Sequence, residues 1–484
     1  MKQDPQRINL SLVSHTNVGK TTLARTLLGR DIGQVEDRSH VTTMPEDYVL
    51  MRAPDDSELI LWDTPGFGDS VRLAKRLKGR DNPIGWFTAE VLDRFTSKSL
   101  WLNQQAIKHI KDKSNVILYL VNASEPPESL PYVQAEMQIL NWISKPVIVL
   151  LNQMGEIKPQ DEEQKEVQVW KDFLSSHSLI KAVLPLDAFA RCWVQEYELW
   201  NQIKNSLTDK ERPTFESLQQ TWIRGRQAIY ASSVDAMAGY LTKLGGDKEV
   251  LESQSLIERL KSFGRTLGFI KNDLHGAMED AQIALSTRAA DKLLGLTQRL
   301  ISINSLEGEG VKGEILRRLK TDWIAEEKLD PKAGALLGAV AGGAVTGLAA
   351  DIASGGLTLG VGTIGGAIMG ALGGAGVTAA YNVKKGHGQN LLSWSPSAME
   401  GFLIETVLLY LAIAHFGRGR GQWEQSESPA FWKQTVEQVI KDQQIDFKGI
   451  KDGTSTADDV KARWTKIVDK VCRETFKVLY GVSI

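Results

Sequence analysis

Residues 14–22 read SHTNVGKTT and follow directly on a short apolar run. A loop of this kind aims successive backbone N–H groups at phosphate oxygens, at the positive end of the helix that follows it. Gly19 leaves room for a phosphate, Lys20 reaches the β- and γ-phosphates, and the Thr21 hydroxyl ligates Mg²⁺. Ser14 stands where the motif has its first glycine. Because later residues form the N–H cradle, we expect the loop to tolerate this small side chain.

A second element supports the phosphate-binding loop. The stretch LILWDTPGFGD places Asp63 at the end of an apolar strand. Its carboxylate would hold the metal through water, and the Gly66 N–H would meet the γ-phosphate. Between the two elements, RSHVTTMPEDY offers Thr42 or Thr43 as the switch residue that closes on Mg²⁺ when the γ-phosphate is present. For either threonine alone, the alternative is an ordinary loop residue without a role in metal binding.

The strand, the loop, the paired threonines and DTPG together resemble the Era/TrmE-like branch of translation-factor-type GTPases. The whole chain resembles bacterial proteins in which such a domain precedes a domain of unknown function (number 3482). The resemblance is specific in the GTPase domain and includes a glycine-rich stretch, whereas the helical remainder matches loosely. It implies GTP and Mg²⁺ as ligands and slow GTP hydrolysis. It also implies that turnover accelerates on homodimerisation through the GTPase domains or on binding a partner.

Two departures from this family bear on specificity and on turnover. The guanine-reading NKxD pattern becomes LLNQMGE, which keeps Asn152 but puts Gly155 at the aspartate position. A lost polar pair of this kind costs roughly 10²-fold in discrimination, so the residues leave GTP against ATP open, with Glu156 as a candidate substitute. Phe67 stands where Ras-like proteins orient the attacking water with Gln.

The resemblance implies that Asn17 holds a K⁺ beside the phosphates, where the ion supplies positive charge to the transition state. For Asn17, a loop-stabilising amide is the alternative role. Asp69 is a candidate for positioning the attacking water.

The nominated catalytic residues are Lys20, Thr43 and Asn17, and the nominated metal ligands are Thr21, Thr42, Thr43 and Asp63. The nominated nucleotide-binding residues are Thr16, Asn17, Val18, Gly19, Lys20, Thr21, Thr22, Asp63, Gly66, Asn152 and Gln153.

Six apolar runs alternate with helical patterns in residues 1–205 and predict a doubly wound α/β P-loop domain. These strand candidates are residues 8–13, 48–53, 58–63, 115–122, 145–152 and 181–187. The strand signal ends there, so we expect an all-α domain with helices over 213–243, 250–302 and 311–328. The expected parts are a GTPase domain at 1–205, a helical domain at 206–330, a glycine-rich helical hairpin at 331–386, and a C-terminal helical part at 387–484 that packs with 206–330.

Helical spacing gives one apolar stripe of Ala289, Leu293, Leu296 and Leu300. The apolar run at 402–416 is shorter than the ~20 residues that cross a bilayer, which favours a buried core helix.

Residues 333–382 hold 15 of the 43 glycines and one charged residue, Asp351. Asp330 and Pro331 form a good helix start, and the glycines then recur at steps of four. Small residues on one face let two helices approach closely, as is common inside membranes. Two interpretations remain open: a hairpin that inserts into or lies against a membrane, or arms that pack against each other within the helical domain. Lys384 and Lys385 are candidate headgroup contacts.

The composition limits the class of partner. The 484 residues carry a net charge of −2, so the chain has no overall positive field that would attract a nucleic acid. The run at 72–80 is basic, and it serves either as a solvated helix face or as an anion-facing patch. Two cysteines, Cys192 and Cys472, suit reduced thiols in the cytoplasm.

We expect a cytoplasmic GTP-binding switch at the inner membrane. The alternatives are a nucleotide-binding scaffold with negligible turnover and a tRNA- or ribosome-related GTPase.

Overall fold

The computed structural model describes residues 6–28, 46–68, 70–78, 98–155, 157–186, 192–251, 284–285, 288–289, 291–304, 381–386, 389–415, 429–448, 450 and 455–482. It divides into two compact units. One comprises Met1–Ala228 and Ala414–Gln422, and the other comprises Ile229–Ile413 and Trp423–Ile484.

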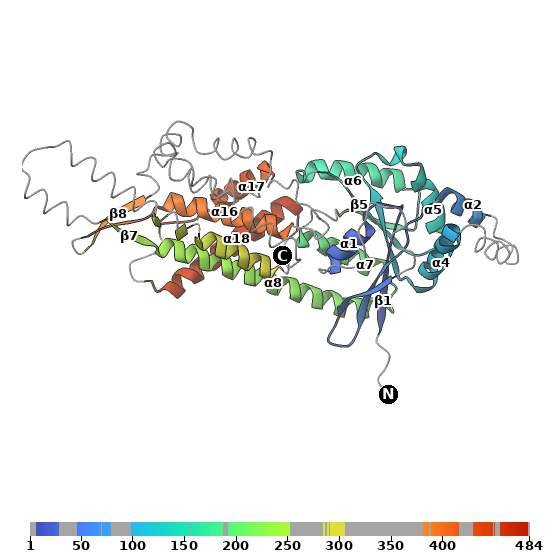
Figure 1. The fold of residues 1–484 in the computed structure, drawn as a ribbon, viewed down its shortest axis with the longest axis horizontal. Coiled ribbons are helices and arrows are strands. Elements are labelled where there is room, and N and C mark those ends of the chain that lie inside the picture. The colour runs from blue at the N-terminus through green and yellow to red at the C-terminus, as the bar shows by residue number, and fades with distance from the viewer. Residues whose placement is uncertain are drawn as a thin grey trace, which may run out of the picture. The chain divides into compact units, whose positions relative to one another are not determined.

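A six-stranded sheet forms the centre of the first unit (Figure 1). Its strands are β1 (Arg7–Ser14), β2 (Glu46–Arg52), β3 (Glu58–Asp63), β4 (Val116–Asn122), β5 (Val147–Asn152) and β6 (Ile180–Pro185), in the order β2-β3-β1-β4-β5-β6. Only the β2–β3 pair is antiparallel; the other neighbours are parallel. All six predicted strands are present, each within two residues of its expected bounds, which confirms the doubly wound P-loop fold.

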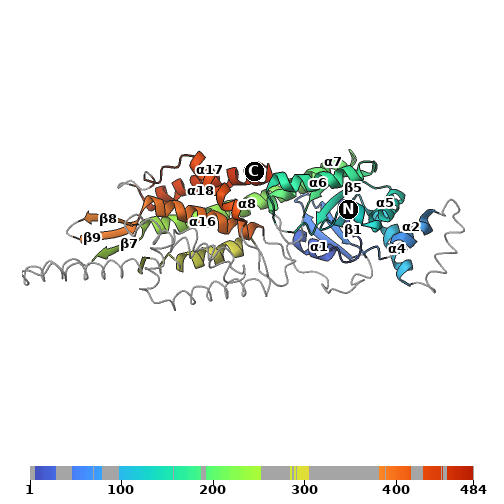
Figure 2. The ribbon, with the colours of Figure 1, turned by 90° about the horizontal axis from the view of Figure 1, so that it is seen from above.

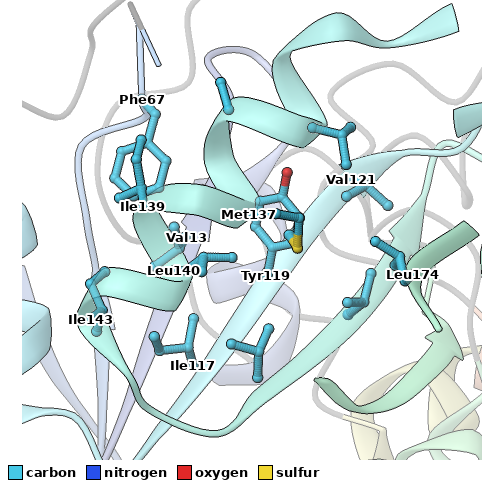
Figure 3. Packing of buried hydrophobic residues seen from close by; sticks show 14 of the residues in the cluster. Val13, Phe67, Ile117, Tyr119, Val121, Met137, Ile139, Leu140, Ile143 and Leu174 are labelled. Carbon is cyan, nitrogen blue, oxygen red and sulfur yellow. The ribbon is translucent and has the colours of Figure 1, made fainter. Parts of the chain in front are cut away.

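Helices cover both faces of this sheet, because side chains of successive strand residues point to opposite faces. In β4, Ile117, Tyr119 and Val121 belong to one apolar core, and Leu118 and Leu120 belong to the other. The first core, part of which is drawn in Figure 3, is completed by α2 (Ser70–Lys78), α4 (Lys98–Lys113), α5 (Pro131–Ile143) and α6 (Gln160–Leu174). The second is completed by α1 (Lys20–Leu28), α7 (Glu196–Ser206) and the start of α8 (Arg212–Gly246). The short 3₁₀ turns η1 (Pro127–Ser129) and η2 (Trp193–Gln195) lie in connecting segments.

The strand register brings the nominated residues to one edge of the sheet. Leu12, two residues before β1 ends, pairs with Asp63, and Asn122 pairs with Asn152. These are the carboxyl ends of parallel strands, the edge at which open α/β sheets bind ligands. The loop between β1 and α1 therefore lies beside the ends of β3 and β5.

The described part of the second unit is mainly helical, as expected. Residues 291–303 are helical, and the named helices are α16 (Pro396–Ala414), α17 (Ala430–Asp442) and α18 (Ala457–Tyr480), with α17 packed on α18 (Figure 2). The rings of Tyr230, Tyr410 and Phe476 lie within 6.4 Å of one another and join α8, α16 and α18 in one core. The predicted stripe of Ala289, Leu293, Leu296 and Leu300 is buried.

The structure corrects the expectation that no strand follows residue 205. A three-stranded antiparallel sheet has the order β7-β9-β8, from β7 (Lys248–Leu251), β8 (Tyr381–Gly386) and β9 (Gln389–Trp394). The predicted hairpin at 331–386 therefore ends in a strand, and Lys384 and Lys385 lie in β8 opposite β9. β7 pairs with a strand that is remote in sequence, so local spacing did not reveal the sheet. The remainder of the hairpin, residues 331–380, lies outside the described residues.

The apolar helix α16 starts earlier than predicted, at Pro396, after Ser395 whose hydroxyl accepts from the Ala398 N–H at 3.1 Å. At 19 residues and a mean hydropathy of 1.6, it is the one described helix that is long and apolar enough to cross a membrane. Within this structure 67% of that window is buried, as in the core helix of a globular unit.

Candidate nucleotide-binding site

The backbone of the loop between Ser14 and Lys20 has the shape of a phosphate cradle. Two of its residues adopt the left-handed conformation, Asn17 with φ 63° and Gly19 with φ 93°. A Cβ built on Gly19 would lie 2.8 Å from the side-chain nitrogen of Asn152, so glycine is required here on two counts. Thr16, Val18 and Thr22 complete the loop and the first turn of α1, with Val18 and Thr22 buried.

Lys20 lies inside the site. Its side chain is buried, and its Nζ donates to the Ser14 hydroxyl over 3.1 Å. Burial lowers the pKa of Lys20, and the carboxylates of Asp63 and Glu136 oppose that shift. Ser14, the departure from the glycine pattern, thus provides an oxygen for the lysine that glycine would not have.

Thr21 and Asp63 meet across the site from different elements. The Thr21 hydroxyl, at the start of α1, donates to Asp63 Oδ2 at 2.8 Å. Asp63 is 2% exposed at the end of β3, and its Oδ1 has no hydrogen-bond partner among the described residues. Burial raises the pKa of Asp63, whereas Lys20 and the Thr21 hydrogen bond lower it. A hydroxyl and a carboxylate with one unsatisfied buried oxygen are the hard ligands that suit Mg²⁺.

These two oxygens leave most positions of an octahedral Mg²⁺ to nucleotide and water. The described residues contain no group of three His, Cys, Asp or Glu side chains that could hold a metal by themselves. The residues present therefore fit a metal that arrives with a phosphate.

The DTPG segment packs directly on the loop. A Cβ on Gly66 would lie 3.1 Å from both Lys20 Nζ and the Thr16 Cα, so a side chain there would displace the loop or the lysine. The Phe67 N–H donates to the Ser14 carbonyl at 2.9 Å, and the Phe67 ring is fully buried beside Ile139 (Figure 3). The residue after the glycine thus belongs to the core and presents no side chain to the site.

The β5 end contributes Asn152, which is fully buried. Its amide donates to the Val18 carbonyl at 2.6 Å and so holds the phosphate loop. Gln153 and Gly155 both have positive φ, at 60° and 84°, and a Cβ on Gly155 would meet nothing within 4 Å. The backbone here turns as a loop after the strand, with no carboxylate at the Gly155 position.

One part of the site was not predicted. His15 Nδ1 lies 2.9 Å from Glu136 Oε1, and the Tyr119 hydroxyl donates to Glu136 Oε2 at 2.6 Å. The sequence motifs point to no role for Glu136 or Tyr119. A signal was present: Glu136 is the single charged residue of α5, whose other positions are apolar or neutral.

Four nominated residues, Thr42, Thr43, Asp69 and Glu156, lie outside the described residues. The others lie at the same edge of the sheet: the loop residues 16–22, Asp63 and Gly66 from β3 and its following turn, and Asn152 and Gln153 from β5 and the turn after it.

Comparison with known proteins places both halves of the chain. Residues 9–153 match the family described as 50S ribosome-binding GTPase, and residues 176–451, more than half of the chain, match Domain of unknown function (DUF3482). GTPase Era from Aquifex aeolicus (strain VF5) is 23% identical over 181 residues, which cover 37% of this chain and 50% of that relative. The chain therefore spans about half the length of this curated relative.

Solved structures of GTPases are also among the matches. A variant of Aquifex aeolicus Era bound to GDP and AlF₄⁻ is 21% identical with a TM-score of 0.30, over 42% of this chain and 58% of that one. Era in complex with MgGDPNP and nucleotides 1506–1542 of 16S ribosomal RNA is 20% identical with a TM-score of 0.31 and the same coverage. The fold, the loop geometry and the family matches agree: the chain belongs to the DUF3482 family, with a P-loop GTPase domain similar to Era in front of the DUF3482 region.

Proposed function

We propose that this chain binds GTP with Mg²⁺, hydrolyses GTP slowly and acts as a switch. The observation that carries the proposal is the Thr21–Asp63 contact of 2.8 Å beside the buried Lys20, with Asp63 Oδ1 left unsatisfied. A buried polar oxygen without a partner is costly, so an oxygen in this position is suited to a ligand that arrives from outside.

Each residue of the site would contact a different part of the Mg²⁺-triphosphate. Lys20 would exchange its bond to Ser14 for phosphate oxygens, and the backbone N–H groups of residues 16–20 would surround them. Thr21 and Asp63 would hold Mg²⁺, directly and through water respectively; the ion neutralises charge between the phosphates. Gly66 would bring its N–H to the γ-phosphate, and Thr42 or Thr43 would close on the metal.

Slow turnover follows from Phe67. A phenyl ring has no hydrogen-bonding group and this one is fully buried, so it cannot orient the attacking water as a glutamine does in Ras-like proteins. Asn17 is exposed in a left-handed conformation at the mouth of the loop, where we propose that it helps to hold K⁺ as a second source of positive charge. Dimerisation through the GTPase domains, or binding of a partner, would then raise the rate by completing the site.

The test is nucleotide binding and phosphate release with purified protein. Mg²⁺-GTP and Mg²⁺-ATP are titrated by calorimetry, and phosphate release is measured in K⁺ and in Na⁺. Lys20→Ala should lose binding, whereas Lys171→Ala, an exposed lysine of α6, should bind as the wild type does. Absence of binding for both nucleotides would refute the proposal. Tight binding without turnover in either salt would instead support a nucleotide-dependent scaffold, which the burial of Phe67 favours as the second candidate.

We also propose that the protein works in the cytoplasm at the inner membrane, directly or through a membrane-protein partner. The support is the composition of residues 333–382, with one charge in fifty positions. Flotation with vesicles of phosphatidylethanolamine and phosphatidylglycerol, with and without nucleotide, tests it. Wild-type protein that stays at the bottom of the gradient in every nucleotide state would exclude direct membrane contact.

A further inference from the structure

The segment at the end of β5, residues 152–155, holds the positions at which the guanine-reading pattern places its polar groups. In this chain it reads NQMG, and none of its side chains is ionisable. Asn152 is fully buried, and its amide donates to the Val18 carbonyl at 2.6 Å. The polar side chain that the pattern retains therefore supports the phosphate loop, and the position of interest for the base is Gly155.

The contacts of its neighbours fix where position 155 lies. Met154 packs against the first core. The Met154 carbonyl accepts from Lys158 Nζ at 3.3 Å, and the same Nζ pairs with Glu166 Oε1 of α6 at 2.5 Å. Gly155 thus follows a residue that is anchored both through its side chain and through its backbone.

Gly155 itself is exposed and has space around it. Its φ is 84°, and a Cβ built on it would meet nothing within 4 Å. Crowding therefore does not require a glycine here, although the left-handed backbone favours one. Aspartate and asparagine adopt this conformation more readily than other residues with a side chain. An aspartate would fit at position 155, yet the chain does not carry one.

The carboxylate that is missing at this position would read one particular edge of a purine. Guanine presents two neighbouring donors there, the N1–H and the 2-amino group, and one carboxylate can accept from both. Hypoxanthine keeps the N1–H and lacks the 2-amino group. A site with a charged acceptor distinguishes these two bases, because only guanine makes the second hydrogen bond. Where the protein offers no acceptor, the 2-amino group stays hydrogen-bonded to water and the distinction is lost.

We propose that Gly155 leaves the purine 2-position unread, so that this chain binds GTP and ITP, two 6-oxopurine nucleoside triphosphates, with similar affinity. This inference rests on the proposed nucleotide binding and concerns only how the base is recognised. The affinities for the two nucleotides should agree within about threefold, because neither base gains a charged hydrogen-bond partner that the other lacks. A carboxylate reader would instead favour GTP by about tenfold or more.

The experiment is calorimetric titration of the full chain with Mg²⁺-GTP and with Mg²⁺-ITP. Gly155→Asp supplies the absent acceptor, and this variant should bind GTP about tenfold or more tightly than ITP. Gly155→Asn is the matched control, because asparagine has the same size and the same tolerance of the backbone conformation but no charge. Its ratio of GTP to ITP affinity should stay closer to that of the wild type than to that of the Asp variant.

Thermal unfolding first checks that both variants fold, which the open surroundings of Gly155 favour. Even without them, the wild-type ratio decides the question. A wild type that binds GTP at least about tenfold more tightly than ITP would overturn the inference and leave nucleotide binding intact. Glu156→Gln would then show whether the neighbouring carboxylate reads the base. A folded Gly155→Asp protein with the wild-type ratio would also overturn it, because position 155 would not face the base. Failure of the wild type to bind either nucleotide would instead overturn the proposed function.

Discussion

The amide of Asn152, at the end of β5, donates to the carbonyl of Val18 in the phosphate loop at 2.6 Å. In the described structure this hydrogen bond therefore acts as a strut, that is, a fixed link between β5 and the loop. The left-handed Gly19 lies against the same amide, so the hydrogen bond and the loop conformation depend on each other.

Asn152→Ala removes this strut. We expect weaker Mg²⁺-GTP binding and a free energy of unfolding lower by about 1–3 kcal/mol, because the buried Val18 carbonyl loses its donor. Chemical denaturation and calorimetry measure the two effects. Asn122→Ala is the control: Asn122 pairs with Asn152 in register, and its side chain accepts a local hydrogen bond from the Ser124 N–H. Equal losses in both variants would argue against the strut.

Gly19→Ala should abolish tight nucleotide binding. Its φ of 93° costs an alanine about 1–2 kcal/mol of strain, and the new methyl group would lie 2.8 Å from the Asn152 amide. Calorimetric titration with Mg²⁺-GTP should show an affinity at least tenfold weaker. Gly225→Ala makes the same substitution inside α8 where a Cβ meets nothing within 4 Å, and it should leave binding intact and raise stability by about 0.5–1 kcal/mol. If both alanine variants bind Mg²⁺-GTP with the same affinity, the close contact between Gly19 and the Asn152 amide is not needed for nucleotide binding.

Phe67→Gln should destabilise the protein without restoring Ras-like turnover. The ring is fully buried in the core shared by α2, α4, α5 and α6, so an amide there loses packing and hydrogen bonds at a cost of about 3 kcal/mol. Phe67→Leu keeps an apolar side chain and should cost less than about 1.5 kcal/mol. Thermal unfolding and phosphate release on both variants test this. Faster hydrolysis by a fully stable Gln variant would show that position 67 can face the phosphates.

The sequence predicted the first unit well because its signals are local. β4 and β5 are continuous apolar runs, and both are buried on two faces. The P-loop motif follows β1, and the DTPG motif begins at the end of β3. Because β1 and β3 are adjacent parallel strands, the two motifs, and with them Thr21 and Asp63, lie side by side.

What was missed depends on contacts between remote segments. His15 and Glu136 are 121 residues apart, and β7 pairs with β9 across more than a hundred residues. No local spacing encodes either pairing. The family resemblance assigns Asn152 to the nucleotide base, whereas in the structure its amide donates to the phosphate loop, a contact that only the folded backbone reveals.

Glu405 should make the stability of the helical unit depend on pH. It is buried in α16, its Oε2 has no hydrogen-bond partner among the described residues, and burial raises its pKa to about 8, with Lys433 opposing and Glu437 reinforcing the shift. Because the folded-state value lies above that of an unfolded glutamate, the unfolded state releases the proton first. Stability is therefore highest below about pH 4.5 as far as this group is concerned, and falls as pH rises towards about 8, with a slope of up to about 1.4 kcal/mol per pH unit.

Glu405→Gln removes the ionisation and keeps the shape. Denaturation between pH 5 and pH 8 should show a flatter profile and a variant more stable than the wild type at the upper end. Glu400→Gln, on the same helix but part-exposed, should leave the profile unchanged. If the wild type and Glu405→Gln show parallel profiles, Glu405 is not a neutral buried acid in the folded protein. The sign of the difference also matters, because a variant less stable than the wild type at pH 8 would mean that the ionised carboxylate has a favourable partner in the folded state.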